Sequence, residues 1–158
     1  MKKSLVAYFS ATETTRGLAE KLAGAIGADL FEIEPREKYS AADLDWTDKT
    51  SRSTTEMNNR ACRPAIAKKI QNFSDYDVIF VGFPIWWYRE PSIIDTFMES
   101  YDFAGKTIVP FATSGGSPIG DAYKNMQKLA PDATVERGTR FDTGIAPDKL
   151  KKWAENWM

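Results

Sequence analysis

The stretch from Lys3 to Gly27 constrains the fold more than any other part of this chain. It begins with an apolar run, Leu5 to Phe9, that has no polar alternation. Such a run is typical of a strand that is buried on both faces. A helical pattern follows, with apolar residues on one stripe and Gly27 placed to end the helix. A buried strand that leads into a helix predicts the first unit of a parallel α/β sheet.

The loop between this strand and this helix carries four hydroxyl groups in six residues. A loop that enters a helix presents unpaired backbone N–H groups and the positive end of the helix dipole, and this combination suits a phosphate. A single Ser or Thr that caps the helix would explain only one of the hydroxyls. From the loop alone, both interpretations stay open. Its residues are Ser10, Ala11, Thr12, Glu13, Thr14 and Thr15.

Apolar runs and helical patterns continue to alternate along the chain. Strands are expected at 29–35, 78–83, 106–112 and 134–141, and helices are expected to start at Arg63-Pro64, Pro91, Pro118 and Pro147. Pro110 is an objection to the third of these strands, because proline cannot donate to a ladder. The polar segment 36–62 is a long loop with room for a short helix at 41–46 or 53–59. Five alternations predict one domain, residues 1–158, with a parallel sheet, helices on both faces and right-handed crossovers.

Charge and composition limit the partners of the chain. The net charge is −1, so bulk electrostatics recruits neither nucleic acid nor an anionic membrane. No segment reaches the length that spans a bilayer, and the apolar run near the N-terminus is too short for a secretory signal. We therefore expect a cytoplasmic protein with no nucleic-acid or membrane partner.

The chain contains no histidine and one cysteine, Cys62. An internal disulfide, a four-ligand Cys/His zinc site, and Ser-His-Asp or Cys-His catalysis are all excluded. If the chain is an enzyme, a cofactor carries the chemistry, and no residue is predicted to be catalytic.

Three loops are expected to meet beyond the carboxyl ends of the strands, where such sheets bind ligands. The loop 10–15 offers donors for a phosphate, the loop 84–90 offers adjacent aromatic side chains, and the loop 113–118 offers a Gly-Gly pair that lets the backbone approach a planar edge. Taken alone, the aromatic residues could equally pack under a loop or form a subunit contact. The three loops together favour a ligand with a phosphate and an aromatic ring system.

These same segments resemble the flavodoxins and flavodoxin-like flavin oxidoreductases. The matching motifs run from Phe9 to Thr15, from Val81 to Trp87 and from Ala112 to Ser117, and they occur in the correct order over essentially the whole chain. The resemblance implies a three-layer α/β/α sandwich whose five-stranded parallel sheet has the order 2-1-3-4-5, with FMN at the switch point. No large loop interrupts the last strand, so the chain resembles the short-chain type.

The resemblance also implies which residues hold FMN. The loop 10–15, with its hydroxyls and amides, would bind the phosphate without needing Lys or Arg. Glu13 departs from the small residue found in many flavodoxins, and its carboxylate is expected to point away. Pro84, Ile85, Trp86, Trp87 and Tyr88 would flank the isoalloxazine, with Trp86 or Trp87 stacked on it. Thr113, Ser114, Gly115, Gly116 and Ser117 would border its polar edge.

Other ligands of related folds are disfavoured by the loop sequence. It has neither the G-x-G-x-x-G pattern of a dinucleotide site nor a Walker P-loop, and it lacks the acidic residues of a receiver domain. Cys62-Arg63 lies in the polar insert, so a thiol phosphatase loop is also missing.

Two functions remain. In one, FMN accepts electrons from NAD(P)H or a reductase and reduces a quinone or a similar small acceptor, with the insert 36–62 shaping the pocket. In the other, the protein is a flavodoxin that carries electrons between partner proteins. Near-neutral charge and the long insert favour the oxidoreductase slightly, although Asp43, Asp45 and Asp48 could form an acidic docking patch. A homodimer is a further expectation from the resemblance, and a scaffold that has lost its flavin is disfavoured by the intact loops.

Overall fold

The computed structural model describes residues 2–114 and 118–158 of the chain. Short 3-10 turns at Phe73–Asp75 and Glu155–Trp157 accompany the main helices and strands. These main elements are β1 (Ser4–Tyr8), α1 (Thr14–Ile26), β2 (Asp29–Glu32), α2 (Arg52–Asn58), β3 (Val78–Pro84), α3 (Ser92–Glu99), β4 (Thr107–Thr113), α4 (Ala122–Leu129), β5 (Thr134–Val135), β6 (Thr139–Arg140) and α5 (Pro147–Ala154).

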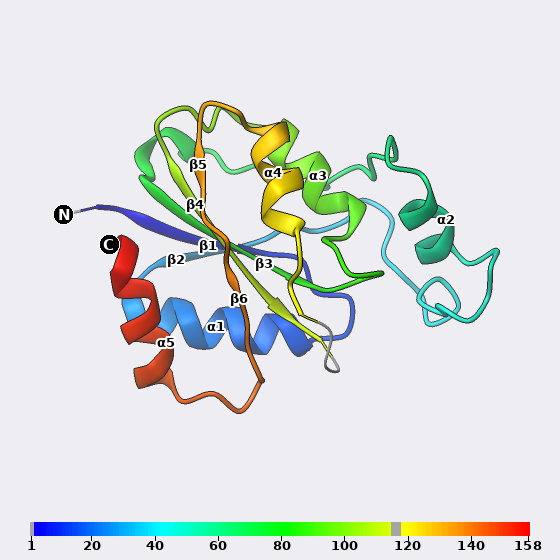
Figure 1. Ribbon diagram of the computed structural model, residues 1–158, viewed down its shortest axis with the longest axis horizontal. Coiled ribbons are helices and arrows are strands. Elements are labelled where there is room, and N and C mark those ends of the chain that lie inside the picture. Colours follow the sequence, from blue (N-terminus) through cyan, green and yellow to red (C-terminus); the bar gives the residue numbers. More distant parts are fainter. Residues whose placement is uncertain (1, 115–117) are drawn as a thin grey trace.

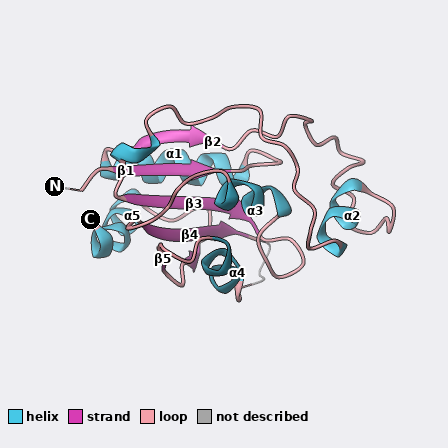
Figure 2. Cartoon of the chain, turned by 90° about the horizontal axis from the view of Figure 1, so that it is seen from above, coloured by secondary structure: helices cyan, strands magenta, loops and turns pink. Residues whose placement is uncertain are grey.

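All strand pairs in the sheet are parallel, and the strand order is β2-β1-β3-β4-β5, with β6 also paired to β4. Helices α1 and α5 cover one face, and α3 and α4 cover the other (Figure 1). Seen from above, α2 lies beyond the carboxyl ends of the strands, away from both helical layers (Figure 2). The predicted α/β class, the three layers and the order 2-1-3-4-5 are confirmed.

Each central strand divides its side chains between two cores, as the two-residue period of a strand requires. In β1, Leu5 and Ala7 pack on the face of α3 and α4, whereas Val6 and Tyr8 pack on the face of α1 and α5. All four are buried. This two-sided burial explains why the strand reads as one continuous apolar run.

The predicted last strand, 134–141, is split into β5 and β6 opposite Pro110. Thr134 N donates to Lys106 O at 2.9 Å and Glu136 N donates to Ile108 O at 2.8 Å. The next bond of this ladder would need an N–H from Pro110, which proline lacks. Pairing resumes at β6, after Gly138 with its φ of 80°. Pro110 therefore stays within β4, and its missing N–H is accommodated by a break in the neighbouring strand, between β5 and β6.

The prediction that a helix starts at Arg63-Pro64 is wrong. This segment is extended, and Ile66 forms an antiparallel bridge with Pro35 just after the edge strand β2. Two backbone bonds hold it: Arg36 N to Ala65 O at 2.8 Å, and Ala67 N to Glu34 O at 2.7 Å. Ile66 and Ile70 have the spacing of a helix, but backbone hydrogen bonds to the residues after β2 keep the segment extended.

Two other boundaries differ from the sequence prediction. Helix α4 starts at Ala122 rather than at Pro118, because Gly120 has a φ of 61°, which no right-handed helix accommodates. In the insert, α2 forms close to the predicted 53–59, whereas 41–46 forms only turns.

A buried polar cluster fixes the loop after β3 against α3 and α4. Arg89, Glu90 and Asp95 are each less than a tenth exposed. Arg89 Nη1 lies 3.4 Å from Asp95 Oδ2, and Asn125 Nδ2 of α4 donates to Glu90 Oε2 and, at 3.1 Å, to Asp95 Oδ1. Arg63 adds a second cation, 4.0 Å from the same Asp95 oxygen.

Within this cluster, Glu90 Oε1 is buried and receives no hydrogen bond from the described residues. Burial, and then the hydrogen bond and negative charge of Asp95, raise the pKa of Glu90 to about 9. A protonated Glu90 explains both observations, because its hydroxyl can donate to the Asp95 carboxylate.

We expect the stability of the protein to fall with pH because of Glu90. Between about pH 5 and pH 9 the unfolded chain has released this proton while the folded protein keeps it. The free energy of unfolding therefore decreases as pH rises, by at most about 1.4 kcal/mol per pH unit. Glu90→Gln removes the effect, so urea denaturation at pH 5, 7 and 9 should show the variant gaining stability relative to the natural protein as pH rises. A difference that stays constant over this range would contradict a protonated Glu90.

Candidate functional site

The predicted loops lie together at the carboxyl edge of the sheet, where a cavity of about 470 Å³ opens between them. The loop after β1, the loop after β3 and the end of β4 all contribute to its walls, which agrees with the general location of ligand sites in such sheets. The residues that line it are Thr12, Thr14, Pro84, Ile85, Trp86, Thr113, Ser114, Phe141, Asp142, Thr143 and Gly144.

The hydroxyl-rich loop divides its side chains between two tasks. Ser10 Oγ accepts a hydrogen bond from Arg16 N at 3.1 Å, and Thr15 Oγ1 lies 2.9 Å from Thr113 Oγ1 in a buried contact. Thr12 and Thr14 line the cavity with their Oγ1 atoms 3.4 Å apart. Two hydroxyls therefore hold the loop in place, and two border the cavity.

The backbone of this loop is suited to an anion. Helix α1 begins at Thr14 with no acidic residue in its first turn, and the residue before it, Glu13, makes no side-chain cap bond. Among the described residues, the amides from Ala11 to Thr15 donate to no other group. Two of these five residues, Thr12 and Thr14, line the cavity, so the start of the helix borders it.

Glu13 occupies the position before the helix with a φ of 67°, a left-handed conformation that favours glycine. Its carboxylate pairs with Arg16 Nε at 3.2 Å. Glu13, Ser10 and Ala11 border a separate cavity of about 190 Å³ on the side of β2. Arg16 also donates to Glu32 at 2.8 Å, so this one cation is shared between two carboxylates and offsets part of the Glu13 charge outside the larger cavity.

The aromatic loop after β3 ends in a tight hairpin turn. Trp86 and Arg89 exchange backbone hydrogen bonds of 3.0 and 3.1 Å, and the two residues between them, Trp87 and Tyr88, have φ values of 47° and 65°. This is the type I′ arrangement, which usually contains Asn-Gly, so it is strained here. Pro84, Ile85 and Trp86 line the cavity, whereas Trp87 is 39% and Tyr88 72% exposed.

The third predicted loop is described only in part. Thr113 and Ser114 line the cavity, and Ser114 accepts two hydrogen bonds from Arg140, at Oγ (2.9 Å) and at O (3.2 Å). The predicted residues Gly115, Gly116 and Ser117 lie outside the described residues.

Sequence reasoning missed the segment 141–144, which forms one wall of the cavity. It follows β6, so it reaches the same edge as the other loops, and its place directly after the last strand was the available signal. Arg140 Nη2 pairs with Asp142 at 3.0 Å, and Lys21 Nζ donates to Thr143 O at 2.8 Å. Both contacts hold this segment against the rest of the domain.

Sequence reasoning expected the insert 36–62 to shape the pocket but missed the residue that makes the contact. Tyr39 of the insert packs against Trp86 and Phe9 in a cluster of three rings. Burial and the hydrogen bond to Glu56 raise the pKa of Tyr39, so its hydroxyl remains a donor. No sequence signal links a tyrosine in a polar segment to a tryptophan 47 positions later.

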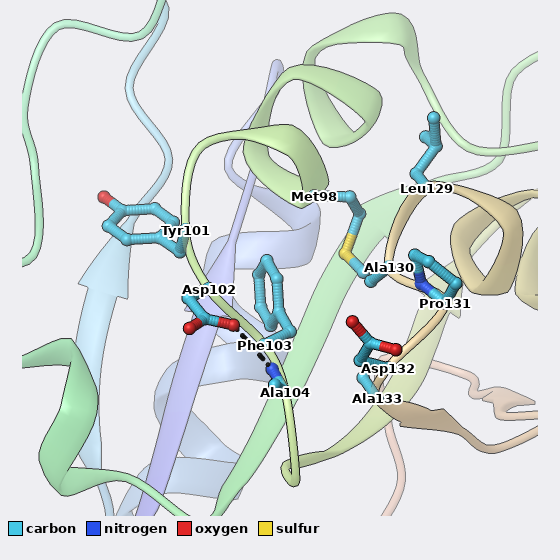
Figure 3. Close-up of a pocket in the computed structure, with 10 residues that line it drawn as sticks. All are labelled: Met98, Tyr101, Asp102, Phe103, Ala104, Leu129, Ala130, Pro131, Asp132 and Ala133. Atoms are coloured by element: carbon cyan, nitrogen blue, oxygen red, sulfur yellow. Dashed lines mark hydrogen bonds between the residues drawn. The ribbon is translucent and has the colours of Figure 1, made fainter.

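A smaller cavity of about 120 Å³ lies among the residues that precede β4 and β5, at the opposite edge of the sheet (Figure 3). Tyr101, Phe103 and Asp132 are among its walls, and Asp102 is bonded to Ala104 N at 3.0 Å. None of the predicted site residues lines it.

The structure describes the whole chain except residues 1 and 115–117. In that part of the chain no cluster of Cys, Asp or Glu side chains could hold a metal ion. None of its helices combines the length and the apolar composition needed to cross a bilayer.

Comparison with known proteins agrees with this architecture. A candidate flavoprotein from Bacteroides eggerthii is 47% identical, with 99% of this chain and 98% of that one covered and a TM-score of 0.93. A second, from Bacteroides uniformis, is 48% identical over 98% of both chains, with a TM-score of 0.91. A flavoprotein from Lactobacillus acidophilus, solved in complex with FMN, shares the fold at 24% identity, with 98% and 99% coverage and a TM-score of 0.75.

The comparison with curated proteins found no match. The family model for flavodoxins matches residues 3–157, which is nearly the whole chain. The family predicted from the sequence is therefore confirmed, and the chain belongs to the flavodoxin family.

Proposed function

We propose that this chain is an FMN-dependent oxidoreductase that takes electrons from NAD(P)H or a reductase protein and passes them to a quinone or a similar small acceptor. The observation that carries the proposal is the cavity of about 470 Å³, which joins free backbone donors at one loop to aromatic side chains at another. FMN has a phosphate at one end and a planar ring system at the other, and it supplies the electron-transfer chemistry when bound.

The residues present fit FMN as the cofactor. The unpaired amides from Ala11 to Thr15 and the hydroxyls of Thr12 and Thr14 can hold a phosphate dianion, and the Glu13 carboxylate is drawn toward Arg16. Membership of the flavodoxin family and the Lactobacillus acidophilus flavoprotein in complex with FMN support this cofactor.

At the other end, Pro84, Ile85 and Trp86 offer apolar walls for the ring system, and Thr113 and Ser114 offer polar contacts to its edge. The exposed rings of Trp87 and Tyr88 stand in the adjoining turn, where they can stack on a planar acceptor. The roles of these side chains are to orient the reactants and to keep water from the reacting atoms.

A specific observation favours the second candidate, an electron-carrying flavodoxin. Asp43 and Asp48 lie in the exposed insert, and backbone hydrogen bonds from Ser40 and Thr50 lower the pKa of their carboxyls. With Asp45 they form an acidic segment that could steer a basic partner. The net charge of −1 is weak for such docking, so the oxidoreductase remains our proposal.

The cofactor is tested by fluorescence titration of the apo-protein with FMN and with riboflavin. We expect FMN to be bound tightly and quenched, and riboflavin, which lacks the phosphate, to be bound much more weakly. The double variant Thr12→Val, Thr14→Val should weaken FMN binding by about tenfold or more, because charge-assisted hydrogen bonds are lost, and should leave riboflavin binding unchanged.

Thr50→Val, in the insert and outside the cavity walls, is the control for this titration. Equal binding of FMN and riboflavin would contradict the phosphate site. If neither FMN nor riboflavin binds, FMN is not the cofactor of this protein.

The reaction is tested with the FMN-loaded protein, a water-soluble quinone, and NADH or NADPH. We expect steady turnover, and we expect Tyr88→Asn to raise the KM for quinone about three- to tenfold, as the loss of one aromatic contact predicts. Asn tolerates the positive φ of this position, so the turn is kept while the ring is removed. FMN affinity should not change.

The matched control for the turnover assay is Trp46→Ala. It removes an aromatic ring that is 74% exposed and lies in the insert, away from the turn that carries Tyr88. If the protein passes no electrons to the quinone with either nucleotide or with a reductase protein as the donor, yet is itself reduced by the reductase at a rate that falls steeply with salt, the carrier function is correct instead.

A further inference from the structure

Trp86 connects the candidate site to the insert. It lines the larger cavity, and it also makes edge-on contacts with Phe9 (centroids 5.6 Å apart, planes at 88°) and with Tyr39 (5.5 Å, 76°). Phe9 and Tyr39 contact each other at 5.6 Å, which closes the cluster. Phe9 and Tyr39 also border the cavity of about 190 Å³ on the side of β2. The three rings therefore lie between that cavity and the cavity of about 470 Å³.

The ring of Tyr39 is itself held by the helix α2. Its hydroxyl donates to Glu56 Oε1, and the Arg52 guanidinium lies over its face, 3.9 Å from the centroid. Arg52 Nε also donates to Glu56 Oε2 at 2.9 Å, so the two charged side chains, four residues apart, brace each other around Tyr39. Arg52 Nη1 donates to Glu37 O at 2.7 Å, which ties this brace back to the chain next to Tyr39.

Helix α2 is in turn attached to the body of the domain near the aromatic turn. Ser92 Oγ, at the start of α3, donates to Glu56 O at 3.3 Å. Arg89 Nη2 donates to Met57 O at 3.4 Å. The two ends of the turn, Trp86 and Arg89, are thus both in contact with the insert.

We propose that Tyr39 is a positioning residue for the flavin: braced by Arg52 and Glu56, it fixes the Trp86 ring at the wall of the site. The insert 36–62 is then part of the cofactor site and not a solvated excursion. This inference rests on the proposed FMN site, and it concerns how that site is held ready rather than which groups touch the phosphate.

The expected effect follows from the contacts. An edge-on aromatic pair adds a favourable interaction beyond simple burial, so the Tyr39 ring favours one orientation of Trp86. Without Tyr39, Trp86 has more rotamers available, so only a fraction of the apo-protein presents the binding arrangement and the apparent affinity falls by that fraction.

The test uses purified apo-protein and three variants. Tyr39→Leu removes the ring, Tyr39→Phe keeps the ring and removes only the bond to Glu56, and Tyr101→Leu is the matched control. Tyr101 is also half-buried, packs against Phe73 at 4.5 Å and accepts a hydrogen bond from Ile70 N, but it lies by the cavity at the opposite edge (Figure 3).

Two quantities are measured for each variant: the dissociation constant of FMN, and the near-ultraviolet circular dichroism of Trp86, isolated as the difference from a Trp86→Phe counterpart. Tyr39→Leu should raise the dissociation constant about three- to tenfold and flatten the Trp86 signal, as the loss of an edge-on contact predicts. Tyr39→Phe should keep most of the FMN affinity and most of the Trp86 signal. Tyr101→Leu should change neither the affinity nor the signal, although it should lose about as much stability as Tyr39→Leu.

An unchanged dissociation constant and an unchanged Trp86 signal in folded Tyr39→Leu would overturn the inference, as would an equal effect of Tyr101→Leu. If the natural apo-protein binds no FMN, the proposed function fails by itself. The Trp86 signal then still decides whether Tyr39 fixes this ring.

Discussion

Backbone hydrogen bonds that continue the parallel ladders past the ends of the strands determine where the site residues lie. Phe9 N donates to Gly82 O at 2.9 Å, Ile85 N donates to Thr113 O at 2.9 Å, and Phe141 N donates to Ala112 O at 2.9 Å. Each of these bonds belongs to the first residue beyond a strand, so the four loops leave the sheet at nearly the same level. The cavity walls, which come from segments as far apart as Thr12 and Gly144, are therefore brought together by main-chain pairing. Because main-chain pairing sets the level of the loops, some of their side chains, such as Thr12 and Thr14, remain at the cavity.

This dependence explains what the sequence could predict. Strands buried on both faces must be apolar throughout, so β1, β3 and β4 were recognisable, and with them the loops 10–15 and 84–88 that follow. Segments whose structure depends on distant partners were not recognisable. Ile66 and Ile70 have helical spacing, yet pairing next to β2 keeps this segment extended, and both side chains still pack on the core. Tyr39 was missed for the same reason, since its role depends on neighbours remote in sequence, whereas the wall 141–144 could have been found from its place directly after the last strand.

Backbone strain is concentrated at the candidate site. Glu13, Trp87 and Tyr88 are the described non-glycine residues with positive φ, and all three lie in loops around the cavity. Such conformations cost of order 1–3 kcal/mol each and persist only where the surroundings enforce them. For the turn, the enforcement comes from the buried cluster of Arg89, Glu90 and Asp95 on one side and from the Tyr39–Trp86 contact on the other. Both sets of contacts stabilise a turn that its own sequence disfavours, which is expected where geometry matters more than local stability.

The hydroxyl-rich loop shows how one short sequence can serve stability and binding together. Ser10 accepts from the backbone of α1, and Thr15 is bonded to Thr113 across the sheet, so these two hydroxyls are satisfied within the protein. Thr12 and Thr14 stay at the cavity. A loop made only of ligand-facing hydroxyls would have to be ordered by the ligand, and the affinity would be reduced by the entropy of that ordering. Because the bond between Thr15 and Thr113 links the loops after β1 and β4, the free amides of the first loop and the polar residues at the end of β4 are fixed relative to each other. The four hydroxyls, which first suggested a phosphate site, are therefore divided between two that hold the loop and two that line the cavity.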